Sequence, residues 1–171
     1  IAFLDGTLIK WSFPSTGSDF LRDYFIKKGI VKSLDKIENI ASKNPLGVVS
    51  YISKPRATDI INLLRISNNY CSFLTTDCRS NCSTFEHTKR PCSDLNNILD
   101  RDVFSLTLKP LHRSSLFKSS STIVKNYYQT HQIFFYYVNT GNEIARIELP
   151  EWAAMNKDIL GLSHSIVLQQ S

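Results

Sequence analysis

Residues 46–67, LGVVSYISKPRATDIINLLRIS, contain a strand signal, a turn signal and a helix signal in close succession. The β-branched and aromatic residues of segment 46–53 predict a strand that Pro55 ends. Segment 57–67 places Ile60, Leu63 and Leu64 at helical spacing, which predicts an amphipathic helix. A strand followed directly by a helix is typical of an α/β protein with some parallel strand pairing.

The regions on either side extend this pattern. Residues 1–11 predict another strand, and residues 132–149 predict a β-hairpin around the glycine-containing turn TGN. The predicted helices cover residues 18–29, 33–42, 122–130 and the segment from about residue 156. We therefore expect an α/β fold in which a mixed sheet is flanked by helices.

Composition limits the class of protein. The 171 residues are enough for one domain with a substantial core, and an apolar fraction of 42% argues against disorder. Neither a membrane-spanning run nor a secretory signal is visible, so we expect no membrane association and a cytoplasmic location. The net charge of +5 is compatible with a polyanionic partner such as DNA. Because the chain begins and ends inside regular elements, we expect a fragment lacking both ends of its domain.

Residues 67–97 differ from the rest, because they are poor in aliphatic side chains and contain every cysteine. The spacing C-x6-C-x3-C-x9-C joins Cys71, Cys78, Cys82 and Cys92. A segment without its own core needs a crosslink, which a four-cysteine zinc site or an iron–sulfur cluster supplies, with His87 as a substitute ligand. Disulfides and unligated thiols remain alternatives, because the C-x2-C pair of zinc sites is missing.

Asp5 interrupts the apolar run at the start of the chain. Strand alternation would place Phe3, Asp5 and Thr7 on one face, where a carboxylate needs a partner. One interpretation is that the Asp-Gly pair begins a turn. We favour a metal-binding carboxylate at the strand centre, because apolar residues continue beyond it and Mg²⁺ and Mn²⁺ prefer oxygen ligands. The haloacid-dehalogenase-like phosphatase signature is excluded, because it needs a nucleophilic aspartate where Phe3 stands.

Several polar residues are candidate contacts for phosphate. Lys54 and Arg56 follow the predicted strand at the start of a helix, and Arg113 and Lys118 lie in a serine-rich segment. The competing interpretation of both groups is a solvated loop. Further along, Arg146 and Glu148 share one face of a predicted strand, where a surface or edge ion pair is the simplest interpretation.

In combination, these segments resemble the NurA family of DNA repair nucleases. The resemblance is carried by FLDGTLIKW, GVVSYISKPRATDIINLLR, LDRDVFSLTL, KPLHRSSLF and IFFYYVNTGNEIARIELPEWA. It implies a ribonuclease H-like fold and a manganese-dependent nuclease with 5′–3′ exonuclease and single-strand endonuclease activity. It also implies a homodimer that resects DNA double-strand breaks with the hexameric translocase HerA. The cysteine segment looks like an insertion into this partial NurA domain of residues 1–171.

The resemblance transfers to few residues. Asp5 matches a metal-binding aspartate of the family's D-G-[ST]-L strand, so we expect it to hold Mn²⁺ or Mg²⁺. An earlier aspartate and glutamate of the family would precede Ile1, and a catalytic histidine would follow Ser171. Arg56, Arg113, Arg146 and Glu148 match motif positions and are expected to organise the site or contact DNA. The alternative function is a non-catalytic, zinc-stabilised DNA-binding module.

Overall fold

The computed structural model describes residues 1–10, 24–44, 46–67 and 92–170. The chain forms two compact units: unit 1 comprises Ile1–Lys54 and Leu108–Ser171, and unit 2 comprises Pro55–Thr107. The whole described sheet belongs to unit 1.

Unit 1 contains a five-stranded mixed sheet with the order β1-β2-β5-β4-β3. Strand β1 pairs in parallel with β2, whereas the remaining neighbours are antiparallel. The strands are β1 (Ala2–Asp5), β2 (Val48–Ile52), β3 (Phe117–Lys118), β4 (Ile133–Asn139) and β5 (Ile144–Pro150). The predicted hairpin is confirmed, because β4 and β5 pair along their full length and Gly141 takes a φ of +94° in the turn between them.

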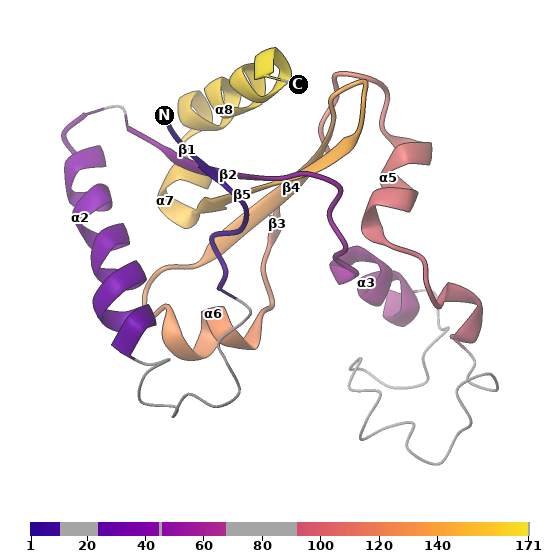
Figure 1. The fold of residues 1–171 in the computed structure, drawn as a ribbon, viewed down its shortest axis with the longest axis horizontal. Helices are drawn as coiled ribbons and strands as arrows, with labels where there is room; N and C mark the ends of the chain where they lie inside the picture. The colour runs from indigo at the N-terminus through magenta and orange to yellow at the C-terminus, as the bar shows by residue number, and fades with distance from the viewer. Residues whose placement is uncertain (11–23, 45, 68–91, 171) are drawn as a thin grey trace. The chain divides into compact units, whose positions relative to one another are not determined.

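Helices cover both faces of this sheet (Figure 1). Helices α7 (Glu151–Ala154) and α8 (Lys157–Gln170) pack against a cluster that includes Val49, Ile147 and Tyr136, and we call this the α8 face. The opposite face, which we call the α6 face, packs against α6 (Thr122–Tyr127) and against the helical segment before β2. The predicted α/β class with a mixed sheet flanked by helices is therefore confirmed.

The segment before β2 corrects one sequence prediction. A π-helix, η1 (Phe25–Val31), runs directly into α2 (Lys32–Ala41), so no helix ends at Gly29. Glycine inside a helix costs about 1 kcal/mol relative to alanine. Burial of Ile26, Val31 and Leu34 against the α6 face offsets this cost, and the two predicted helices become continuous.

Unit 2 contains α3 (Asp59–Ser67), the short 3₁₀-helix η2 (Ser93–Leu95) and α5 (Asp100–Thr107). Asp100 is fully buried, and its Oδ1 accepts the N–H groups of Ile60 at 3.0 Å and Ile61 at 2.9 Å. The carboxylate therefore satisfies two backbone donors in the first turn of α3. The predicted helix of residues 57–67 is confirmed, and α5 was not anticipated.

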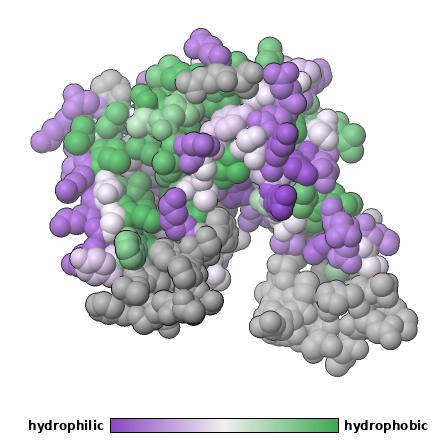
Figure 2. Space-filling model, in the orientation of Figure 1, coloured by the Kyte–Doolittle hydropathy of each residue, from purple (hydrophilic) through white to green (hydrophobic). Residues whose placement is uncertain are grey.

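Unit 1 also has an apolar groove of about 640 Å³ along β1. Phe25, Ile30 and Ile37 line it together with residues of β1, and Figure 2 shows hydrophobic residues gathered on this side of unit 1. Among the helices of the described residues, none has the length and apolar character to cross a membrane.

Candidate functional site

Strand β1 ends at Asp5, whose side chain is exposed at the carboxyl end of the strand. Gly6 follows with a φ of +96°, a conformation that favours glycine and turns the chain away from the sheet. The Gly6 N–H donates to the Tyr51 carbonyl oxygen at 2.9 Å, so the turn begins directly beside the β1–β2 ladder. The prediction that Asp5 lies at the centre of a strand is therefore wrong, because the Asp-Gly pair begins a turn.

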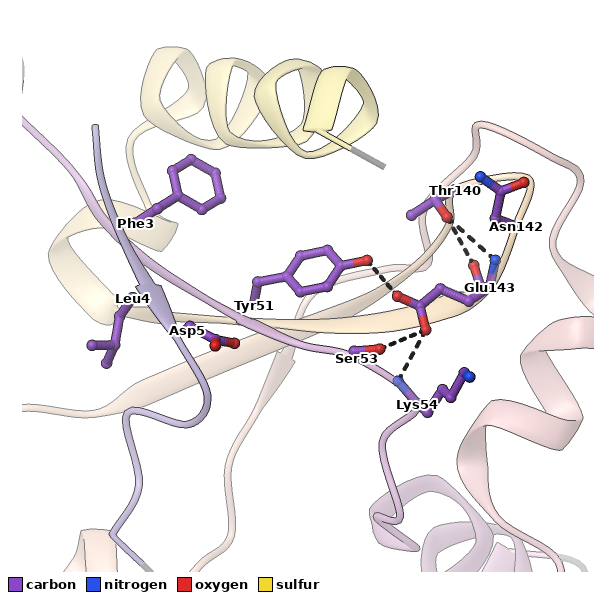
Figure 3. Close-up of a pocket in the computed structure, with 9 residues that line it drawn as sticks. All are labelled: Phe3, Leu4, Asp5, Tyr51, Ser53, Lys54, Thr140, Asn142 and Glu143. Atoms are coloured by element: carbon purple, nitrogen blue, oxygen red, sulfur yellow. Dashed lines mark hydrogen bonds between the residues drawn. The ribbon is translucent and has the colours of Figure 1, made fainter.

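Asp5 lines an open pocket of about 710 Å³ in unit 1 (Figure 3). The ends of β1 and β2 and the β4–β5 turn supply its walls. The lining residues are Phe3, Leu4, Asp5, Tyr51, Ser53, Lys54, Thr140, Asn142 and Glu143. The pocket therefore brings together two residues that the sequence singled out, the Asp5 carboxylate and the Lys54 cation. Its volume is in the range of pockets that bind small ligands.

Glu143, which the sequence did not single out, organises this pocket. Its Oε1 accepts the Tyr51 hydroxyl at 2.7 Å, and its Oε2 accepts the Ser53 hydroxyl at 2.8 Å and the Lys54 N–H at 3.2 Å. Burial, together with the Glu143 carboxylate, raises the pKa of the Tyr51 hydroxyl well above its usual range, so the hydroxyl remains a donor. Three donors thus hold one carboxylate against the end of β2.

The backbone at Lys54 is the strained part of the pocket. Its φ is +45°, a left-handed value that costs roughly 1 kcal/mol or more for a residue with a Cβ. The contact from its N–H to Glu143 and the adjacent Ser53 contact fix this conformation. Such strain is concentrated at functional sites, and here the backbone conformation sets the direction in which the Lys54 side chain extends.

Glu148 holds the loop that follows Asp5. Its Oε2 accepts the Thr7 hydroxyl at 2.7 Å and the Leu8 N–H at 2.9 Å. Tyr128 supports the same loop, because its hydroxyl donates to the Leu8 carbonyl oxygen at 2.6 Å and accepts the Lys10 N–H at 3.2 Å. Burial raises the pKa of the Tyr128 hydroxyl above its usual value, and the Glu148 charge contributes in the same direction. The loop that follows Asp5 is therefore held by two side chains far along the sequence.

The Arg146–Glu148 pair is buried, which corrects the prediction of a surface or edge ion pair. Arg146 Nε donates to Glu148 Oε1 at 3.0 Å, and the two side chains are 3% and 1% exposed. The Arg146 guanidinium lies 3.8 Å from the centre of the Phe135 ring, in a cation–π contact. Strand β5 lies in the middle of the sheet, and all of its residues are buried, so the pair lies in the interior of unit 1.

The other basic candidates lie away from Asp5 or in unit 2. Lys118 is on β3, at the opposite edge of the sheet from β1. Arg113 bridges to Val138 of β4, with its guanidinium 5.4 Å from the Tyr136 ring centre. Arg56 is exposed and belongs to unit 2. The structure therefore joins Lys54, but neither Arg113 nor Lys118, to the Asp5 pocket.

A comparison with models of protein families matches residues 1–167 to the NurA domain. The chain belongs to the NurA family. This confirms the resemblance carried by its motifs and makes the chain a member of a nuclease family associated with DNA repair. Comparisons with curated proteins and with solved structures find no match.

The Asp5 pocket has one exposed carboxylate of the type that ligates Mn²⁺ and Mg²⁺. Within residues 1–10, 24–44, 46–67 and 92–170, no three His, Cys, Asp or Glu side chains are grouped to hold a metal ion. Mn²⁺ and Mg²⁺ nevertheless need only one or two carboxylates, because waters and substrate phosphates complete their coordination. The exposed Asp5 carboxylate fits this role, whereas three hydrogen bonds already engage Glu143.

Little of the cysteine segment belongs to the described residues. Cys71, Cys78, Cys82 and His87 lie outside them, so a shared zinc or iron–sulfur site stays a prediction. Cys92 is described, and it is a buried free thiol in unit 2. Metal analysis of the purified protein would test the prediction.

Proposed function

We propose that this chain contributes Asp5 to the active site of a metal-dependent DNA nuclease that hydrolyses phosphodiester bonds. The NurA domain supports nuclease activity, and the observation that supports a site at this pocket is Asp5, exposed at the end of β1 in a pocket shared with Lys54. A mixed sheet with a carboxylate at the end of a strand is compatible with the ribonuclease H-like fold that we propose for the complete domain.

Asp5 and Lys54 have separate roles in this proposal. Asp5 would hold Mn²⁺ or Mg²⁺ through its carboxylate. When bound, such an ion activates water and neutralises charge on the phosphoryl oxygens during an in-line displacement. Lys54 would contact a backbone phosphate, which fixes the strand in the pocket without reading its sequence. Glu148 and Tyr128 hold the loop after Asp5, and Glu143 holds the turn that carries Lys54.

The proposed reactions are 5′–3′ exonuclease and single-strand endonuclease cleavage during resection of DNA double-strand breaks. The test uses the complete natural protein with 5′-labelled and 3′-labelled duplexes and a circular single strand. We expect Mn²⁺-dependent shortening from the 5′ end, opening of the circle, and no product in EDTA. The absence of cleavage with both Mn²⁺ and Mg²⁺ would contradict the proposal.

We further propose that the protein acts as a homodimer with a HerA-type hexameric translocase. Sedimentation of the complete protein tests the dimer. Mixing it with the translocase and ATP tests the partnership, and we expect faster and longer resection than with the nuclease alone. Equal resection with and without the translocase would exclude this partner.

A further inference from the structure

We propose that the pocket beside Asp5 binds one nucleotide of a single DNA strand, with the base stacked on the Tyr51 ring and the phosphate near Asp5 and Lys54. This inference rests on the proposed nuclease function, because a metal ion at Asp5 would reverse the local charge. It adds a substrate subsite, which family membership alone does not supply.

The ring is adjacent to the carboxylate because of the strand register. Tyr51 is the β2 partner of Asp5, and neighbouring strands lie about 4.8 Å apart. Phe3 is two residues before Asp5 on β1, so its ring shares the α8 face with that of Tyr51. Figure 3 shows both rings on the side of the sheet that faces α8, at the edge of the pocket. Both side chains are half-buried, which leaves part of each ring accessible.

Glu143 makes the Tyr51 ring a fixed surface. The 2.7 Å hydrogen bond from the hydroxyl to Oε1 fixes the far end of the side chain, while the backbone is fixed by the sheet. A ring that is already ordered loses little conformational entropy when a base stacks on it. The same carboxylate orders the Lys54 backbone, so one residue positions both a stacking surface and a cation.

The chemistry of the pocket favours a nucleotide over an apolar ligand. The lining combines two aromatic rings with the Lys54 cation, hydroxyl groups, the Asn142 amide and the carboxylates of Asp5 and Glu143, and its volume is about 710 Å³. An aromatic ring beside a cation is the arrangement that binds single strands without sequence preference. The groove along β1, lined largely by residues such as Phe25, Ile30 and Ile37, lacks this combination.

Fluorescence of 2-aminopurine placed at successive positions of a single-stranded oligonucleotide tests the stacking directly. The complete protein carries Asp5→Asn and the buffer contains EDTA, so the strand stays intact and the carboxylate charge is removed. We expect quenching at one position near the bound end. Tyr51→Leu should abolish this quenching and weaken binding about 5- to 100-fold, the range for loss of one base–aromatic stack. Tyr51→Phe keeps the ring and should retain the quenching.

Tyr24→Leu is the matched control, because Tyr24 is exposed on unit 1 and does not line the pocket. Equal quenching in folded Tyr51→Leu and in its parent would overturn the proposal. Photocrosslinking of a 5-iodouracil strand avoids any change to the ring, and crosslinks should map to Tyr51 or Phe3. Crosslinks confined to other residues would also overturn the proposal.

The two proposals fail separately. If Mn²⁺-dependent cleavage requires Asp5 but the quenching is the same without the Tyr51 ring, the nucleotide site is wrong and the nuclease assignment stands. If quenching requires Tyr51 but no divalent ion supports cleavage, the nucleotide site stands and the nuclease assignment is wrong.

Discussion

Replacing Glu148 by glutamine should destabilise the protein strongly, because it removes the carboxylate charge that the buried Arg146 guanidinium contacts at 3.0 Å. The two side chains are 1% and 3% exposed, so water cannot compensate. Removing one partner of a buried ion pair costs about 3–5 kcal/mol, which is a large fraction of the roughly 5–15 kcal/mol that stabilises a typical domain. Urea unfolding followed by circular dichroism at 25 °C measures this loss in free energy of unfolding.

A second variant separates the cost of burying the Arg146 charge from the cost of losing the contacts between Glu148 and the loop after Asp5. Arg146→Met combined with Glu148→Gln removes the charge, while one Gln oxygen remains to accept the Leu8 N–H. This double variant should recover at least about 2 kcal/mol relative to Glu148→Gln alone. Glu151→Gln, on a half-buried residue of α7, is the control and should change stability by about 0.5 kcal/mol or less. A loss below about 1 kcal/mol for Glu148→Gln would refute the reasoning.

Two further predictions concern other parts of the chain. Asp100→Ala should lower the free energy of unfolding of unit 2 by about 1–3 kcal/mol, because the N–H groups of Ile60 and Ile61 lose their acceptor. Asp100→Asn should lower it less, and urea unfolding distinguishes the two variants. Burial, assisted by Arg113, lowers the pKa of His164 below its usual 6.5, so folding opposes its protonation. The stability contributed by neutral His164 should be complete above pH 6.5 and decline as the pH falls toward the lower folded pKa, and His164→Gln should flatten this slope in melts across pH 5–8.

Local patterns predicted the elements that depend on local physics. The β4–β5 hairpin followed from two strand-like runs around a glycine-containing turn, and α3 followed from its apolar spacing. The strand end at Asp5 was missed because Leu8 and Ile9 extend the apolar run. They are 6% and 0% exposed, yet they lie in a loop whose N–H groups find side-chain partners, so their burial does not require a strand.

The organisation of the site depends on contacts that a local pattern does not contain. Glu143 meets Tyr51 across 92 positions of sequence, and Glu148 meets Leu8 across 140. The sequence identified Asp5 and Lys54 as candidates through residue type and motif. It could not show that the hairpin turn would bring a carboxylate to order the pocket around them.

Cleavage of single-stranded DNA in Mn²⁺ by the complete protein, compared with its Asp5→Asn and Asp158→Asn variants, tests the central claim most directly. Asp158 is an exposed aspartate in the first turn of α8 and does not line the pocket, so its variant controls for loss of surface charge. Loss of a residue that supports a metal ligand costs about 10- to 100-fold, so loss of the ligand itself should cost at least about 100-fold. We predict this loss for Asp5→Asn with an unchanged melting temperature, and wild-type rates for Asp158→Asn. Equal cleavage rates in all three proteins would contradict the account.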